Sequence, residues 1–523
     1  MKTKQLFFCS LTGLALLTAS CSSNDEALNG GDGTTSEGKT YAQIAISVAN
    51  SATTRTTTPG YTGDEAYGDD AEYTVNDLTV VLANENDIAM QVITPTLKTV
   101  TNTDDDDKLV RVTEPFKCTP GTYKVYVLAN YKNRQDALTP IIKGSTDMKA
   151  EFGITKIAEL STTNEFFMTN VSAPERQEIK EAASGKEVDD AGTEITNGKT
   201  NLNLLKVDVE RAVSKVTFDN TDNQSFNVMV GDNKIAKATL EGASLINLNK
   251  KMYLVKDGQT ATNKPVTGEW PYPKDPNYDN TSMDKAYITA NFDQASASES
   301  GFTAPSLAKF YCPENTMEAS AQLNGQTTGV VYKVKYAPVD GYYTELAAKN
   351  GTDSYSKMFE AVLNLADDVR DPVIKNTIFT TAEGTDGTTG TFYSYNGYVF
   401  KTKAGARLYK AIATANTGDD AAAVNAAFKT NANDDDIQTY KEGYCYYTAW
   451  IKHNPGGTTM QQDKYGVVRN FWYELKVNNI KKLGYSKPTY KGPKDPDDKA
   501  EASIQVQVKI KKWRLVKQNV DLE

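Results

Sequence analysis

The sequence predicts an all-β protein made of stacked antiparallel sheets. Apolar and polar residues alternate over short stretches, as where Tyr123, Val125 and Val127 alternate with Lys124 and Tyr126. Clusters of Thr, Asn, Asp and Gly bound these stretches at short intervals, and neither helical heptads nor a long apolar run stands out. Alternation with a period of two is typical of strands with one buried face, and frequent turn residues favour a β-sandwich.

Helical segments are expected to be few and short. The best candidates are 360–368 and the alanine-rich stretch 404–428, because alanine has the highest helix propensity. A polar stretch rich in Glu, Lys, Asp and Gly, 173–199, separates two halves of the chain. We therefore expect a domain boundary near residue 200, with β-sandwich domains at 56–200 and 201–523.

Charge and composition exclude several classes of protein. The chain of 523 residues has 57 Lys and Arg against 67 Asp and Glu, which gives a net charge of −10. Nucleic acid is not an expected partner, because duplex phosphates repel such a chain. His453 is the single histidine, so no site can use two histidines. With no dinucleotide, phosphate-loop or nucleophile-elbow motif, we predict no catalytic residues and no cofactor.

Cysteines and acidic runs also argue against metal sites. We interpret Cys118, Cys312 and Cys445 as small buried hydrophobic residues, with one disulfide plus a free thiol as the alternative. They contain no C-x-x-C pair of the kind that zinc sites use. Three acidic runs lack the spacing of a calcium loop, and we expect them to be solvated: 104–107, 434–436 and 495–498.

The N-terminus reads as a signal peptide over 1–20. Lys2 and Lys4 precede an apolar stretch, 6–17, that is too short to span a bilayer, and small residues lead to Cys21. A cysteine at this place predicts a bacterial lipoprotein, in which the Cys21 thiol accepts a lipid. An ordinary secretory signal cut near Ala19 is the alternative. Two or more acyl chains would anchor the precursor stably in a membrane.

Residues 21–55 are expected to form a tether and a removable strand. A polar stretch rich in Ser, Asn and Gly leads to the alternating residues Ile44, Ile46 and Val48. Arg55 follows in a Thr-rich linker and is the only basic residue between Lys39 and Lys98. An exposed polar linker of this kind is accessible to a trypsin-like protease, which would cut between Arg55 and Thr56.

The C-terminus carries a long alternating pattern. Apolar residues at 504, 506, 508 and 510 face one side, and the pattern continues with Trp513, Leu515, Val520 and Leu522. Such a segment suits a strand donated to another chain, because backbone hydrogen bonds give affinity and alternate side chains fill pockets. The alternative is a strand of the chain's own sheet, which fits 502–511 well. We favour 513–523 as the donor.

Four segments along the chain resemble the fimbrillins of Bacteroidales, the major and minor subunits of type V pili. Together with the lipoprotein signal and the C-terminal strand, they cover both predicted domains, although the loops 257–300 and 376–445 match nothing. The segments are 121–130 (GTYKVYVLAN), 207–216 (VDVERAVSKV), 310–315 (FYCPEN) and 465–475 (YGVVRNFWYEL). Within them we expect Arg211, Lys215 and Arg469 to form buried pairs rather than a catalytic centre.

The resemblance implies two tandem β-sandwich domains of the transthyretin-like, Greek-key type, and a function in building a fimbria. It implies a lipoprotein precursor in the outer membrane, cleaved after Arg55 so that the first strand leaves with the propeptide. The C-terminal strand of another subunit would then fill the groove. The implied partners are other copies of the chain, accessory fimbrial subunits, a processing protease and a host or bacterial surface ligand. A tip or accessory role is the alternative to a stalk subunit.

Two other functions are weaker. A surface lipoprotein that binds glycans would use aromatic side chains, and Tyr444, Tyr446, Tyr447 and Trp450 form the densest aromatic cluster. Their partial alternation fits a core strand equally well. A hydrolase that uses two carboxylates is favoured only by the abundance of Asp and Glu, without a paired placement.

Overall fold

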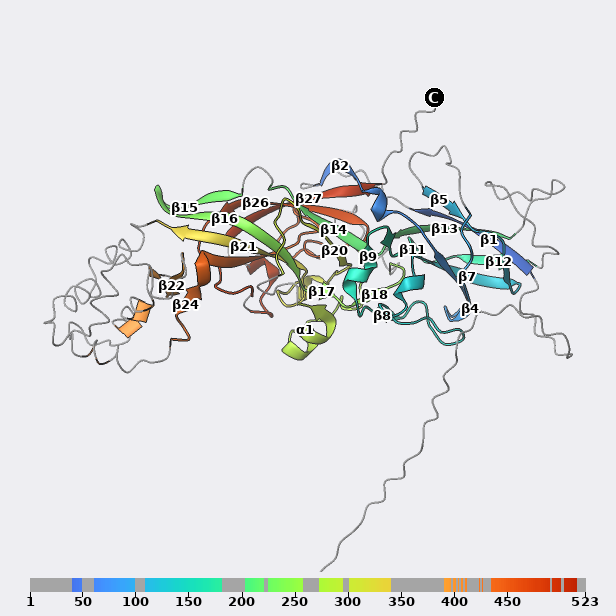
Figure 1. The fold of residues 1–523 in the computed structure, drawn as a ribbon. Helices are drawn as coiled ribbons and strands as arrows, with labels where there is room; N and C mark the ends of the chain where they lie inside the picture. The colour runs from blue at the N-terminus through green and yellow to red at the C-terminus, as the bar shows by residue number, and fades with distance from the viewer. Residues whose placement is uncertain are drawn as a thin grey trace, which may run out of the picture. The chain divides into compact units, whose positions relative to one another are not determined.

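The computed structural model confirms the all-β class. It describes residues 40–48, 61–98, 109–180, 203–220, 224–256, 272–294, 301–339, 390–396, 398–400, 434–489, 492–499 and 503–514, together with isolated positions between 403 and 426. Most of these residues lie in strands or in the turns between them (Figure 1). None of the described helices is long and apolar enough to cross a membrane.

The first large sheet has nine strands in the described chain. Its order is β4-β3-β7-β11-β13-β1-β5, with β12 paired to β7 and β6 paired to β1. The strands are β1 Thr40–Val48, β3 Leu78–Ala83, β4 Ala89–Ile93, β5 Leu109–Val112, β6 Phe116–Cys118, β7 Gly121–Ala129, β11 Met168–Asn170, β12 Arg176–Ile179 and β13 Leu204–Arg211.

Two further sheets are built mainly from the second half of the chain. A five-stranded sheet has the order β2-β27-β26-β14-β20, and a four-stranded sheet has the order β15-β16-β21-β25. Their strands are β2 Tyr61–Tyr67, β14 Val213–Phe218, β20 Lys309–Pro313, β26 Phe471–Ile480, β27 Ile504–Arg514, β15 Ser225–Val230, β16 Asn233–Ile246, β21 Gly329–Pro338 and β25 Tyr444–Trp450.

Short strand pairs and helical turns connect these sheets. The pairs are β9 Ser161–Thr162 with β10 Glu165–Phe166, β17 Leu248–Asn249 with β19 Phe292–Asp293, and β18 Lys251–Tyr253 with β8 Glu151–Gly153. A small sheet joins β22 Phe392–Tyr395 to β23 Tyr398–Phe400 and β24 Gln438–Tyr440. The 3-10 turns are η1 Asp70–Glu72, η2 Lys132–Arg134, η3 Ile157–Leu160, η6 Ala319–Ala321, η7 Lys441–Gly443 and η8 Asp497–Lys499.

Helix α1, Lys285–Asn291, was not among the helices expected from the sequence. Asp284 caps it, because its side chain accepts a hydrogen bond from the backbone N–H of Tyr287 at 2.8 Å. The expected helix at 360–368 lies outside the described residues. Within the expected helix at 404–428, the described positions are helical: Ala406, Arg407, Lys410, Ala411, Ala423 and Ala426.

The apolar residues gather in two main clusters. The first holds buried residues of the nine-stranded sheet, such as Ile44, Val80 and Val127. The second lies between the five-stranded and four-stranded sheets, since both contribute to it, for example through Tyr473 and Tyr332. This face-to-face burial is that of a β-sandwich. The domain boundary near residue 200 and the Greek-key topology stay predictions.

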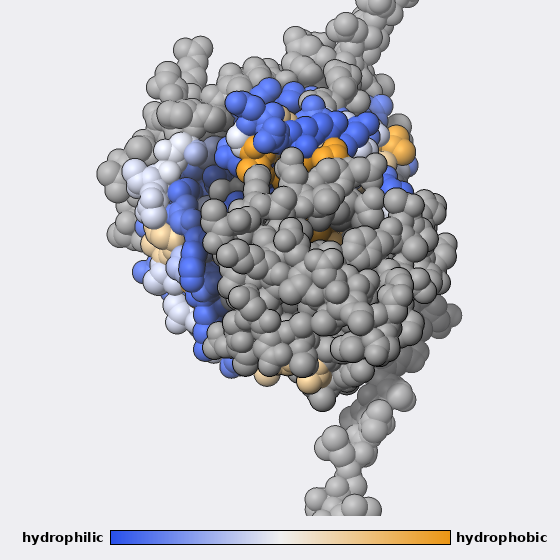
Figure 2. All heavy atoms as spheres, turned by 90° about the vertical axis from the view of Figure 1, so that its left-hand side faces the viewer, coloured by the Kyte–Doolittle hydropathy of each residue, from blue (hydrophilic) through white to orange (hydrophobic). Residues whose placement is uncertain are grey.

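On the face in Figure 2, the described residues are mostly hydrophilic, with a few hydrophobic ones among them. Among the described residues, the large apolar side chains that are clearly exposed are Met90, Val92, Ile142, Met229, Val230 and Leu307. None of these is aromatic. Single exposed apolar residues are ordinary on a protein surface.

Candidate assembly site

Strand β1 contains the predicted removable residues, and it lies inside the first sheet. Ile44, Ile46 and Val48 are each fully buried in the first apolar cluster. β1 pairs in parallel with β13, from Gln43 opposite Leu204 to Val48 opposite Val209, and it pairs antiparallel with β5 and β6 on its other edge. It therefore supplies both apolar side chains to the core and backbone groups to neighbours on both sides.

Polar side chains also fix the first half of β1. The Gln43 side chain donates to the carbonyl oxygen of Thr113 at 2.7 Å, and Thr40 Oγ1 donates to the carbonyl oxygen of Lys180 at 2.8 Å. Asn203 Nδ2 donates to the carbonyl oxygen of Tyr41 at 2.9 Å. These bonds set the register of the strand, because a shift by one residue would leave each group without its partner.

The predicted processing positions Cys21, Arg55 and Thr56 lie outside the described residues. The described chain resumes at β2, which belongs to a different sheet from β1. β2 pairs in parallel with β27 in the five-stranded sheet. The linker that contains Arg55 thus connects two strands that share no ladder.

The C-terminal pattern forms strand β27. It pairs antiparallel with β26 along nearly its whole length, and Val508 and Ile510 are buried in the second cluster. Residues 504–514 are therefore a strand of the chain's own sheet, which was the alternative interpretation for 502–511. Trp513 belongs to this strand, whereas Leu515, Val520 and Leu522 lie outside the described residues.

Trp513 joins β27 to the first cluster. Its side chain is fully buried there, beside Phe166 and Tyr311, at ring-centroid distances of 6.2 and 5.9 Å. Its indole N–H donates to Glu72 Oε2 at 2.9 Å, and its carbonyl oxygen accepts from Arg211 Nη2 at 2.7 Å. The Arg211 guanidinium also lies over the indole, 4.0 Å from the ring centroid. We call the group formed by these contacts the Trp513 anchor; its members are Trp513, Glu72, Arg211, Lys215 and Tyr311.

Glu72 is the acidic centre of the Trp513 anchor. Lys215 Nζ lies 2.6 Å from Glu72 Oε1, and Tyr311 OH donates to the same oxygen at 2.5 Å. Burial lowers the pKa of Lys215, and the neighbouring Glu72 opposes that shift. Burial likewise lowers the pKa of Arg211 to about 10. Glu72 therefore lies where its carboxyl group can balance positive charge that the core would otherwise exclude.

Gly68 leaves room for the hydrogen bond between Trp513 and Glu72. A Cβ atom at this position would lie 2.6 Å from Trp513 Nε1 and 2.4 Å from Glu72 Oε2. Neither group can move without breaking the buried bond. The anchor therefore depends on a residue without a side chain just after β2.

Replacing Trp513 with Phe is expected to lower the free energy of unfolding by about 2–4 kcal/mol, since Phe cannot donate to the buried Glu72 and leaves a void. Trp472 gives a matched control on the neighbouring strand. It is partly exposed and donates to the neutral Thr217 hydroxyl at 2.7 Å, so Trp472→Phe should cost about 1 kcal/mol. Urea unfolding of both variants measures the difference, and equal losses would contradict this account of the anchor.

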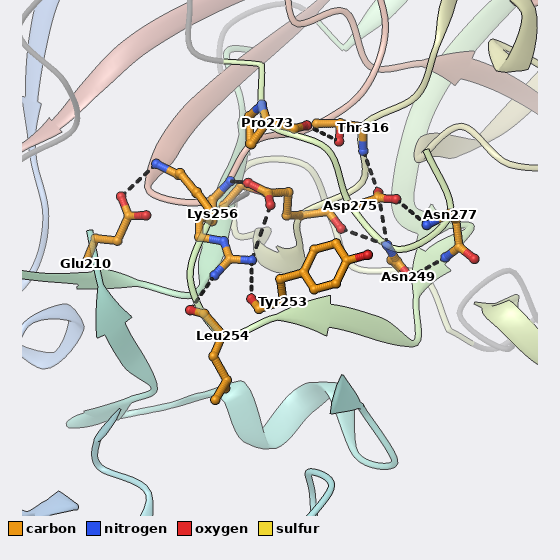
Figure 3. A network of polar contacts seen from close by, with 12 residues as sticks. Glu210, Asn249, Tyr253, Leu254, Lys256, Pro273, Asp275, Asn277 and Thr316 are labelled. Atoms are coloured by element: carbon orange, nitrogen blue, oxygen red, sulfur yellow. Dashed lines mark hydrogen bonds and ion pairs between the residues drawn. The ribbon is translucent and has the colours of Figure 1, made fainter. Parts of the chain in front are cut away.

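A second buried polar network includes Glu210, Lys256 and Asp275, which are labelled in Figure 3, together with Arg469 and Glu314. Arg469 Nη2 lies 3.2 Å from Glu314 Oε1, and its guanidinium also donates to the carbonyl oxygens of Tyr253 and Leu254, at 2.8 and 3.1 Å. Nearby, Lys256 pairs with Glu210 at 2.8 Å. The network ties the end of β18 to strand β13 and to the turn before β26.

Asp275 lies in the same network and is fully engaged. Its carboxylate accepts from the backbone N–H of Thr316 and of Asn277, each at 2.7 Å, and from Asn249 Nδ2 at 3.1 Å. Burial raises its pKa to about 8, against the opposing effect of these donors. A pocket of about 320 Å³ lies beside it. Through these three hydrogen bonds Asp275 joins the backbone at Asn277 and Thr316 to the side chain of Asn249.

Glu314→Gln is expected to lower the free energy of unfolding by about 3–5 kcal/mol, because the buried Arg469 would lose its counter-charge. Glu85 provides the control, since its pair with Arg176 at 3.0 Å is exposed on both sides. Glu85→Gln should cost less than about 1 kcal/mol. Thermal or urea unfolding compares the two. Similar small losses in both variants would refute the claim that the buried Arg469 requires Glu314 as its counter-charge.

The predicted buried pairing is confirmed for Lys215 and Arg469 but not for Arg211. Lys215 pairs with Glu72 and Arg469 with Glu314, with all four side chains buried. Arg211 donates to Asn470 Oδ1 at 2.9 Å and to Trp513, instead of to a carboxylate. Glu314 lies within the segment 310–315, which the sequence analysis singled out. Nothing in the sequence around Glu72 indicated that it is the partner of Lys215.

The predicted free cysteines are also confirmed. Cys118, Cys312 and Cys445 are all buried thiols without a disulfide. Burial raises the pKa of Cys118 to about 11 and that of Cys312 and Cys445 to about 12. They remain protonated and unreactive at neutral pH.

One acidic run departs from its prediction. Asp497 is buried rather than solvated, and it accepts a hydrogen bond from the Thr327 hydroxyl. Its neighbour Asp498 pairs with Lys464. The run at 104–107 lies outside the described residues, and in the described chain no three His, Cys, Asp or Glu side chains gather as metal ligands.

The aromatic cluster on β25 belongs to the interior. Tyr446, Tyr447 and Trp450 are buried, and Tyr444 is partly exposed beneath Lys333, whose Nζ lies 4.0 Å from the ring centroid. Rings that bind sugars must present a free face. These residues therefore act as core, which was the other interpretation of their spacing.

Comparisons with known proteins identify the family at both ends of the chain. Residues 42–208 match the family of the major fimbrial subunit protein FimA, and residues 438–519 match the C-terminal family of fimbrillin, the major fimbrial subunit protein type IV. No curated protein matches the chain.

Two solved structures are similar to the chain over most of its length. A fimbrilin from Porphyromonas gingivalis W83 is 14% identical, with 92% of this chain and 100% of that chain covered and a TM-score of 0.39. A candidate cell adhesion protein from Parabacteroides distasonis ATCC 8503 is 10% identical, with coverages of 91% and 98% and a TM-score of 0.41. The two family matches confirm the resemblance predicted from the sequence: both parts of the chain that match a family are similar to major fimbrial subunit proteins.

Proposed function

We propose that this protein is a structural subunit of a cell-surface fimbria that polymerises by exchange of a strand after cleavage at Arg55. The position of β1 carries the proposal. β1 is buried on one face, paired on both edges and connected to the rest of the chain by the linker that contains the predicted cleavage site. Cleavage there would let β1 leave while β2 and everything after it remain one chain.

Loss of β1 would create a groove that must be filled. The groove would be lined by apolar residues of the first cluster and by unpaired backbone groups of β13, β5 and β6. An open edge of this kind binds a new strand readily. If each subunit receives a strand from the next and gives its own, the contact does not close, and a filament grows.

The C-terminus is the proposed donor. The anchored position of Trp513 limits the donated segment to the residues that follow it, with Leu515, Val520 and Leu522 as the apolar side chains that would enter the groove. The proposed donor is therefore shorter than the segment 513–523 that the sequence favoured. Trp513 itself serves as the attachment of that segment to its own subunit.

Export and anchoring complete the proposal. The precursor would reach the outer membrane as a lipoprotein acylated on Cys21, and a protease specific for arginine would free it for assembly. Its partners would be further copies of the chain and accessory fimbrial subunits. Adhesion to a host or bacterial surface would rely on loops between strands, where variation costs little stability. A tip or accessory subunit is the alternative role.

Arg55→Ala is expected to leave the precursor uncut and monomeric, because no other basic residue lies in the linker. Lys39→Ala is the matched control, since Lys39 is the basic residue before Arg55 and lies outside the polar linker. Mass spectrometry of surface protein should find Thr56 as the first residue in wild type and in the control. High-molecular-weight ladders from the Arg55→Ala variant in an unboiled gel would contradict the proposal that polymerisation requires cleavage after Arg55.

Deletion of 515–523 is expected to abolish polymers while the monomer unfolds at an unchanged temperature, because the Trp513 anchor is retained. Replacing the polar Lys517 and Gln518 by Ser gives a control that keeps the apolar residues of the segment. Electron microscopy of the cleaved proteins provides the readout. Normal filaments from the deletion variant would exclude this segment as the donor.

A further inference from the structure

We propose that the side chains of Lys215 and Glu72 condense to an amide, so that a covalent bond ties β14 to η1 within one chain. The site is the centre of the Trp513 anchor, and the inference does not depend on the proposed polymerisation. It is carried by one juxtaposition, in which a buried amine and a buried carboxyl group lie in contact among hydrogen-bond donors. Both residues follow Arg55, so cleavage there would leave the bond in the subunit.

The first argument is the enclosure of the two reacting groups. Lys215 Nζ lies 2.6 Å from Glu72 Oε1, and each side chain is only 2% exposed. Two indole rings lie close to the amine, with the ring centroid of Trp472 at 3.8 Å and that of Trp513 at 5.5 Å. The fold therefore holds the amine against the carboxyl group and keeps out the bulk water that would reverse the condensation.

The second argument is the protonation state of the pair. An amine is a nucleophile only in its uncharged form, and burial lowers the pKa of Lys215, although the charge of Glu72 opposes that shift. Transfer of one proton from the ammonium to the adjacent carboxylate gives an uncharged amine and an uncharged carboxyl group. Enclosure favours this form, because buried charges are costly. The pair thus supplies both the nucleophile and the electrophile.

The third argument is the placement of donors on the two oxygens of Glu72. Oε2 accepts from the Trp513 indole N–H at 2.9 Å and from the backbone N–H of Asp69 at 3.0 Å. Two N–H groups aimed at one oxygen stabilise the negative charge that develops there when the carboxyl carbon is attacked. Oε1 instead accepts from the Tyr311 hydroxyl at 2.5 Å. Burial raises the pKa of Tyr311, so this hydroxyl stays protonated beside the oxygen that has to leave.

The bond-forming step balances without any other reactant. The lone pair of Lys215 Nζ attacks the carboxyl carbon of Glu72, and the electron pair of the C=O bond moves to Oε2. Collapse of this intermediate restores the C=O bond and breaks the bond to protonated Oε1, which leaves as water. The second proton of that water comes from Nζ through the Tyr311 hydroxyl. One C–N bond replaces one C–O bond, and no group is oxidised or reduced.

The bond would change how the chain carries force. Glu72 precedes β3, and Lys215 follows β13, so the bond would close a covalent loop around every described strand of the nine-stranded sheet except β1. A pull on the two ends of the chain would pass through the bond instead of through these strands. Such a closed loop also limits the freedom of the unfolded chain.

Peptide mass spectrometry of the full chain tests the inference. After denaturation, trypsin should give a branched species that joins 56–98 to 212–234, since it cannot cut after an acylated Lys215. This species should be lighter than the two peptides together by one water molecule, and fragmentation should place the link at Glu72 and Lys215. Recovery of 56–98 and 212–215 only as separate peptides would overturn the inference, and this digest needs no variant that has to fold.

Three variants separate the proposed chemistry from an unrelated loss of water. Lys215→Arg should abolish the branched species, because a guanidinium keeps its charge. Lys256→Arg is the matched control and should retain it, since Lys256 pairs with the buried Glu210 at 2.8 Å elsewhere in the chain. Tyr311→Phe removes the proton relay and should slow formation of the bond after refolding by about a hundredfold. Persistence of the species in Lys215→Arg, or its formation at the wild-type rate in Tyr311→Phe, would contradict the proposed reaction.

Discussion

The hydrogen bond between the Trp513 indole and the Glu72 carboxylate is the interaction on which the connection between the two apolar clusters depends. Trp513 comes from the end of β27, whereas Glu72 follows β2 by way of Gly68. Lys215 of β14 and Tyr311 of β20 bind the same carboxylate. Four strands of one sheet must therefore be in place before the neighbouring core can close, so the formation of the two cores is coupled.

Buried charge recurs wherever segments distant in sequence meet. Lys215 with Glu72 and Arg469 with Glu314 are each fully removed from solvent. The desolvation of such pairs roughly cancels their attraction, so they add little to net stability. Their effect is to penalise every arrangement in which a partner is missing. In this chain the two pairs specify which loop or strand end faces which sheet. Apolar packing alone would allow several such arrangements.

Much of the fold follows from local pattern, and the rest depends on contacts that no local pattern records. Alternation predicted β1, β7 and β27. The four segments that resemble fimbrillins fall on β7, on β13 and β14, on β20 and on β26, and β14 pairs with both β20 and β26. The burial of Lys215 and Arg469 was also foreseen, because cations inside apolar runs need partners. The parallel pairing of β2 with β27 was not, since it joins residues more than four hundred positions apart. Trp513 was placed in a donated tail because alternation cannot tell which core a side chain enters.

Under the proposed strand exchange, the direction of β1 would determine the polarity of the fimbria. β1 is parallel to β13 and antiparallel to β5. A replacement strand that restores both ladders must run the same way, because reversing it changes the hydrogen-bond pattern on each edge. Every subunit would then receive its neighbour's chain in one orientation. A fimbria built this way has two chemically different ends, one with an unfilled groove and one with an unused strand, and it can be capped or extended at each end by a different partner.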